Sequence, residues 1–137
     1  MVKDFLRLLG TWKITGKFIS GSEFLPIIGT DSYELILDGK FILHKADVKM
    51  GDETSETFEI IDLGSSPVAS MHYFNSKGEK GIMHGSIVNN EFKIKSDELK
   101  FAGTISESNS EITGKWFRRD GEKWEHFIDL KLDKPAK

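Results

Sequence analysis

The sequence predicts an all-β protein: a ten-stranded antiparallel up-and-down β-barrel with a short N-terminal helix closing one end. Three observations lead to this prediction. Apolar and polar residues alternate with a period of two from residue 11 almost to the C-terminus. Turn-forming pairs such as Asp38-Gly39 and Asp120-Gly121 interrupt the alternation at short intervals. A meander of so many strands has two unpaired edges in an open sheet, and closure into a barrel removes both.

Length and composition bound the answer further. The chain has 137 residues, which we interpret as one domain spanning 1–137. Its formal net charge of −3 argues against a protein that binds nucleic acid through bulk electrostatics, and its lysines are scattered among acidic neighbours. Cysteine is absent, which excludes disulfides, thiolate catalysis and cysteine-based zinc sites.

The N-terminal segment predicts a helix over residues 2–9. Phe5, Leu8 and Leu9 share one face at helical spacing, and Gly10 is a natural end. Charged residues interrupt this segment, so it lacks the apolar run of a signal peptide. No window approaches the roughly 18 apolar residues of a membrane span. We therefore expect a cytoplasmic protein.

Strands follow from Gly10 onward, and the first shows the pattern clearly, because Trp12, Ile14 and Phe18 alternate with polar residues. The ten predicted strands span residues 11–20, 30–38, 41–50, 54–62, 67–74, 81–88, 91–96, 99–105, 111–118 and 123–132.

The longest predicted connection, residues 20–29, is unusually apolar. It contains Phe24, Leu25, Ile27 and Ile28, whereas surface loops are normally polar. We interpret these residues either as a lid over the open end of the barrel or as additional core packed on the sheet.

The histidines are the most informative residues for function. All four, His44, His72, His84 and His126, fall on the apolar phase of their predicted strands. A loop over residues 75–81 would place His72 opposite His84, with both side chains in one cavity. Each histidine is alternatively a core residue with a hydrogen-bond partner.

Together with neighbouring aromatic and basic residues, the histidines form a predicted binding site for a small molecule that is mostly apolar. Imidazoles would meet polar ligand atoms, aromatic rings would form flat walls, and Arg118 would meet a carboxylate. The predicted ligand-binding residues are Phe18, Tyr33, His44, His72, His84, Trp116, Arg118, Trp124 and His126.

The chain also resembles known proteins over nearly its whole length. A short helix leading into Gly10-Thr11-Trp12, followed by a ten-strand meander, resembles the calycin group of lipocalins and fatty-acid-binding proteins. The run from Tyr33 to Met50 and the later Gly114-Lys115-Trp116 resemble an uncharacterised bacterial family of lipocalin-like domains. The resemblance implies a pocket for a small molecule but names no ligand.

Other functions stay open at this point. Some small ten-strand barrels bind haem, and by that analogy His126 or His84 would be the axial ligand. A small enzyme using His72 or His84 in acid–base chemistry is another alternative, although no catalytic motif is present. We predict no metal site, because close histidine spacing is absent and Glu125 and Asp129 fall on the outward phase. A packed barrel without ligand would act only as an interaction module or homodimer.

Overall fold

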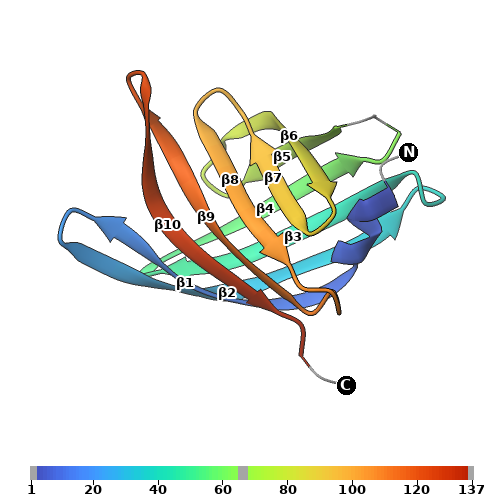
Figure 1. Ribbon diagram of the computed structural model, residues 1–137, viewed down its shortest axis with the longest axis horizontal. Coiled ribbons are helices and arrows are strands. Elements are labelled where there is room, and N and C mark those ends of the chain that lie inside the picture. Colours follow the sequence, from blue (N-terminus) through green and yellow to red (C-terminus); the bar gives the residue numbers. More distant parts are fainter. Residues whose placement is uncertain (1–2, 65–67, 136–137) are drawn as a thin grey trace.

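The computed structural model describes residues 3–64 and 68–135 and shows a closed β-barrel with a short helix at one end (Figure 1). Residue 2 of the predicted helix and residue 67 of a predicted strand lie outside the described residues. The strands are β1 (Gly10–Ser20), β2 (Glu23–Ile36), β3 (Phe41–Met50), β4 (Glu53–Asp62), β5 (Ala69–Asn75), β6 (Lys80–Val88), β7 (Glu91–Lys95), β8 (Leu99–Ile105), β9 (Glu111–Asp120) and β10 (Lys123–Asp133).

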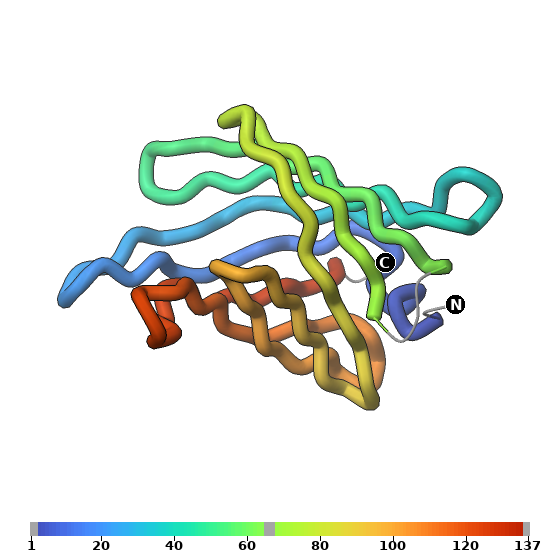
Figure 2. Tube along the Cα trace, turned by 90° about the horizontal axis from the view of Figure 1, so that it is seen from above, coloured from blue at the N-terminus to red at the C-terminus, as the bar shows by residue number. Residues whose placement is uncertain are grey.

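The predicted topology is confirmed. Every strand pairs antiparallel with the next in sequence, and Figure 2 follows the chain through these strands in order. The barrel closes where β1 pairs with β10, from Lys13 opposite Asp133 to Phe18 opposite Ile128. Closure leaves no unpaired edge strand, which is the reason a meander of this length is stable as a barrel.

The N-terminal helix, η1 (Lys3–Leu8), is a 3-10 helix that closes one end of the barrel. Phe5 and Leu8 are fully buried, and the Phe5 ring meets the edge of Phe92 with centroids 5.9 Å apart. The indole Nε1 of Trp12 donates a hydrogen bond of 2.8 Å to the carbonyl of Leu8. So short a segment gains little from helical propensity, and its position depends on this packing.

Arg7 ties the same end together. Its guanidinium donates to the side chain of Asn109 at 2.6 Å, to the carbonyl of Asn89 at 2.5 Å and to the side chain of Asn90 at 3.0 Å. These residues belong to the β6–β7 and β8–β9 turns, so one planar donor group connects the helix to both. We did not anticipate this role from the sequence.

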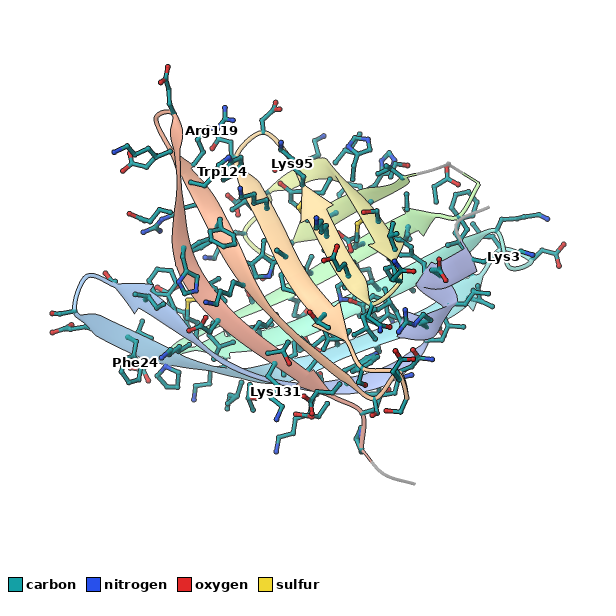
Figure 3. All side chains as sticks on the ribbon, in the orientation of Figure 1. Lys3, Phe24, Lys95, Arg119, Trp124 and Lys131 are labelled. Carbon is teal, nitrogen blue, oxygen red and sulfur yellow. The ribbon has the colours of Figure 1, made fainter. Side chains whose placement is uncertain are left out.

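The predicted lid is wrong. Residues 24–28 are part of β2, which pairs with β1 from Glu23, opposite Ser20, to Tyr33, opposite Gly10. Pairing gives this backbone the hydrogen bonds that a loop would have to find in water. Phe24 and Ile28 are exposed on the outer face, and Phe24 lies near the tip of the hairpin (Figure 3). Ile27, in contrast, is buried inside the barrel.

The predicted inward positions of His72 and His84 are also wrong. Glu59, Met71 and Met83 point into the barrel, so the alternate positions, including His72 and His84, lie on the outer wall. The two histidines are not opposite each other, because His72 pairs with Ile82 across a tighter turn. These strands carry apolar residues on both faces, for example exposed Phe58, Phe74 and Ile82, so periodicity alone did not define the inner face.

A β-bulge changes the orientation at the start of β10. The register of β10 against β9 shifts between His126 and Ile128, so Ile128 points inward while Trp124 and His126 point outward. Trp124 packs beneath the guanidinium of Arg119, 5.0 Å from the ring centroid, near the tip of the β9–β10 hairpin (Figure 3). His126 Nε2 lies 2.9 Å from the carboxylate of Asp129 on the outer face. The inward positions predicted for Trp124 and His126 are therefore wrong.

Candidate ligand cavity

The barrel encloses a cavity of about 410 Å³. It extends from the buried residues above η1 to the opposite end of the barrel, where Met50, Asn75 and Leu99 line it. One wall is apolar, formed by inward residues of β6 to β10 that include Met83, Ile94, Phe101, Trp116, Ile128 and Leu130. A cavity of this size falls within the range of small-molecule pockets, roughly 300–1,000 Å³.

The opposite wall carries a polar cluster contributed by three neighbouring strands. His44 on β3 lies between Asp31 on β2 and Glu59 on β4. Its Nε2 is 2.7 Å from Asp31 Oδ1, and its Nδ1 is 3.0 Å from Glu59 Oε1. The ring of Tyr33 stacks on the imidazole with centroids 4.1 Å apart and planes 4° from parallel. The two carboxylates and the tyrosine are buried.

These contacts determine the charge of the cluster. Burial alone would lower the pKa of His44, but the charge and hydrogen bond of Asp31, together with those of Glu59, raise this pKa from 6.5 to about 10. At neutral pH the imidazole is therefore protonated, and both ring nitrogens donate. Burial, followed by the nearby charges of Asp31 and Glu59, raises the pKa of Tyr33 well above 10, so its hydroxyl stays neutral.

The cluster leaves acceptor atoms open to the cavity. Among the described residues, every buried side-chain nitrogen or oxygen has a hydrogen-bond partner. Asp31 Oδ2 and Glu59 Oε2 make no hydrogen bond, so these two atoms are not among the fully buried ones. Both residues line the cavity. These two oxygens are therefore reachable from the cavity, and each is a charged acceptor in an otherwise apolar space.

The far end of the cavity adds a third carboxylate. Glu79, in the β5–β6 turn, lines the cavity and accepts a 3.0 Å hydrogen bond from the Asn75 side chain. No lysine or arginine of the described part of the chain lines it. Three carboxylates and one imidazolium give the lining a formal charge of −2 at neutral pH.

The predicted binding residues divide into three groups. Tyr33, His44 and Trp116 line the cavity, as does Ile27 from the predicted lid. Phe18 and Arg118 contact each other near its open end without lining it, with the guanidinium 5.8 Å from the ring centroid. The other four, His72, His84, Trp124 and His126, lie on the outer wall. A ligand-binding role for the first group stays a prediction.

The arginine is already engaged. Arg118 Nε donates to Glu125 Oε1 at 2.8 Å, and its guanidinium stacks over Phe127 at 4.9 Å from the ring centroid. Arg118 is thus part of a rim of charged and aromatic side chains. Arg118 does not line the cavity, and its expected contact with a ligand carboxylate stays a prediction.

The residues present do not fit haem. His84 and His126, the predicted axial ligands, point away from the cavity. His44 is the one histidine that lines the cavity, and both of its nitrogens are bonded to carboxylates. An axial ligand needs a neutral nitrogen with a free lone pair.

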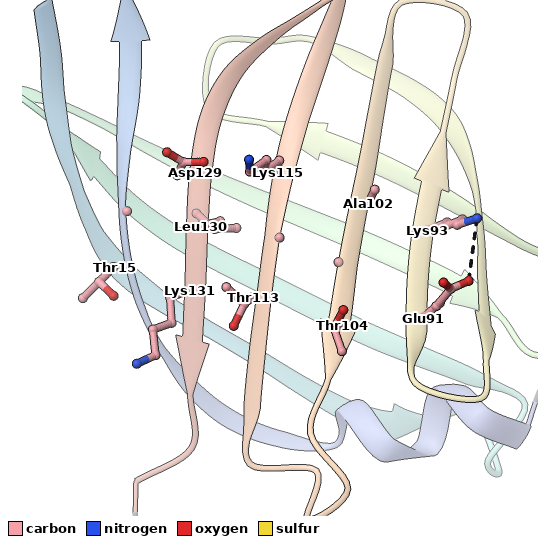
Figure 4. Close-up of a pocket in the computed structure, with 13 residues that line it drawn as sticks. Thr15, Glu91, Lys93, Ala102, Thr104, Thr113, Lys115, Asp129, Leu130 and Lys131 are labelled. Atoms are coloured by element: carbon pink, nitrogen blue, oxygen red, sulfur yellow. Dashed lines mark ion pairs between the residues drawn. The ribbon is translucent and has the colours of Figure 1, made fainter.

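A second hollow lies on the outer surface, across β1 and β7 to β10 (Figure 4). It has a volume of about 610 Å³ and is lined by small and charged side chains such as Thr15, Ala102 and Lys115. Lys93 Nζ lies 3.8 Å from Glu91 Oε2 in an ion pair between two exposed side chains. Although larger, this hollow is a solvated face without buried polar groups. We therefore place the candidate site inside the barrel.

Sequence reasoning missed the two acidic members of the cluster. Asp31 stands two positions before Tyr33, so a consistent inward phase for that strand would have identified it. Glu59 was missed because its strand carries apolar residues on both faces, such as exposed Phe58 and buried Ile61.

Within residues 3–64 and 68–135, no helical segment has the length and hydrophobicity that a transmembrane helix requires.

Comparison with known proteins supports the fold. No protein-family model matches the chain, and neither does any curated protein. The structure is similar to the crystal structure of Rv2717c from M. tuberculosis, with a TM-score of 0.77 at 12% identity over 98% of this chain and 97% of that one. It is also similar to the S-type phycobiliprotein lyase CPES from Guillardia theta, with a TM-score of 0.60 at 8% identity over 98% and 93% of the two chains. These likenesses concern the fold alone, which is a closed antiparallel β-barrel of ten strands.

Proposed function

We propose that the protein binds a small, mostly apolar molecule inside the barrel. One observation supports this above all others: an internal cavity of about 410 Å³, apolar on one wall, with open charged acceptors on the other. Apolar pockets with a few convergent polar groups are typical ligand sites. The fold neighbour named as a phycobiliprotein lyase belongs to the same kind of barrel.

The cavity favours this function over the two alternatives. A packed barrel that serves only as an interaction module would have no such interior space. A histidine-based enzyme would need an imidazole that exchanges its proton near neutral pH, whereas His44 is held protonated. Membership of the bacterial lipocalin-like family, dimerisation and cytoplasmic location stay predictions.

Binding of N-phenyl-1-naphthylamine, a neutral apolar probe that fluoresces in dry surroundings, tests the proposal. We expect saturable fluorescence enhancement with the wild-type protein. Val48→Trp would fill part of the cavity and weaken binding, because Val48 lines it. The matched control is Lys49→Trp, whose side chain is on the outer face of the same strand.

Absence of saturable binding by the wild-type protein would refute the proposal. Equal effects of the two substitutions would place the probe outside the barrel and refute the cavity as its site. Native mass spectrometry of protein purified from cells offers a second test, since a retained small molecule would appear as a mass increment that Val48→Trp reduces.

A further inference from the structure

We infer that the ligand of this cavity carries a positively charged amine, held by the open carboxylate oxygen of Asp31 or of Glu59. This inference rests on the proposed function and specifies the chemical class of the ligand. It defines an amphiphilic cation, with an apolar body against the wall formed by β6 to β10 and a cationic end against the wall formed by β2 to β4.

The first argument is the hydrogen-bond inventory of the cluster. The imidazolium of His44 uses one oxygen of each carboxylate and has no donor left for a ligand. Asp31 Oδ2 and Glu59 Oε2 remain, and both are acceptors. A ligand atom that meets them must therefore donate hydrogen bonds. The neutral hydroxyl of Tyr33, which also lines the cavity, adds one donor at most.

The second argument is charge. One imidazolium lies between two carboxylates, so the cluster keeps one uncompensated negative charge inside the barrel. Glu79 adds another at the solvent-exposed end of the cavity, and the lining contributes no lysine or arginine from the described residues. Negative charge away from bulk water is costly unless a cation offsets it. A ligand carboxylate would be repelled by the same charges, and a neutral alcohol would gain only a hydrogen bond.

The third argument is the position of the polar groups. Asp31 and Glu59 are 6% and 4% exposed and belong to strands on either side of β3. Both carboxylates also line the cavity. The free oxygen of each is therefore a charged acceptor away from bulk water, and an ammonium group of the ligand would offset its charge.

A matched series of octylamine, octanol and octanoate tests the inference by displacement of N-phenyl-1-naphthylamine at pH 7.5. The three compounds share one alkyl chain and differ in the charge of the end group. We expect octylamine to bind about tenfold or more tightly than octanol, as hydrogen bonds to charged groups imply, and octanoate to bind least. Asp31→Asn and Glu59→Gln should each reduce the preference for the amine. The control Glu56→Gln, on the outer face of β4, should leave it unchanged.

A second readout needs no substitution and so does not depend on whether the variants fold. Octylamine should shift the ¹⁵N resonances of the His44 ring more strongly than octanol does, because the cation binds to the same carboxylates. Equal affinity for octylamine and octanol, or an amine preference that survives in both Asp31→Asn and Glu59→Gln, would overturn the inference while the binding function stands. If the fluorescent probe itself fails to bind, the proposed function fails.

Discussion

Because His44 is protonated in the folded protein, we predict a specific dependence of stability on pH. The pKa of His44 is about 10 in the folded protein and near 6.5 when the chain is unfolded. A pKa that folding raises stabilises the protein fully below about pH 6.5, and this stabilisation is lost as the pH rises toward 10. Between pH 6 and pH 9 the free energy of unfolding should therefore fall by about 3 kcal/mol.

The measurement is urea denaturation of the wild-type protein at intervals across this pH range. His44→Gln provides the comparison, because it removes the titrating group and should show a nearly flat pH profile. This substitution also leaves two buried carboxylates without their cation, which costs about 3–5 kcal/mol at neutral pH. If the variant is too unstable to study, a ¹⁵N spectrum of the wild-type protein at pH 8 should show both ring nitrogens of His44 protonated. Stability that stays constant or rises between pH 6 and pH 9, with a neutral His44 at pH 8, would refute the reasoning.

Three further predictions concern the framework around the cavity. Phe5→Ala should cost about 3–5 kcal/mol in urea denaturation because Phe5 is fully buried, whereas Phe74→Ala, at a half-exposed site, should cost far less; similar losses would contradict the assigned faces. Gly114→Ala would put a methyl group 2.5 Å from the ring of Phe101 and should lower the free energy of unfolding by about 1–3 kcal/mol, an effect that calorimetry would detect as a lower Tm. Arg7→Lys should accelerate hydrogen exchange in the β6–β7 and β8–β9 turns, since a lysine does not reproduce the planar set of donors; unchanged exchange would remove the role assigned to Arg7.

The inner face of some strands could be predicted from the sequence alone, for a physical reason. In β7, apolar Phe92 and Ile94 alternate with Lys93 and Lys95, so the inner face follows directly from the sequence. The same holds for β3 and β9, and the inward positions of His44 and Trp116 were predicted correctly. Where one face of a strand is apolar and the other charged, the charged face stays in contact with water and the apolar face is buried in the barrel.

In other strands, local sequence did not select a face. β5 carries Met71 inside and Phe74 outside, and the sequence alone gives the two phases similar weight. The choice comes from neighbouring strands: β3 directs His44 inward, and pairing then places Glu59 on the same side. At the start of β10, one extra residue in a bulge reverses the phase, and such an insertion depends on the partner strand.

The amino-acid sequence by itself determined the class of fold, the closed meander and the closing of one end by the N-terminal segment, because these depend on periodicity, turn residues and the need to pair strand edges. Tertiary structure decided the composition of the site. Asp31, His44 and Glu59 belong to three strands, and only their register brings three titratable groups within hydrogen-bond distance. Such a cluster is a property of strand pairing across the sheet, which no single stretch of sequence contains.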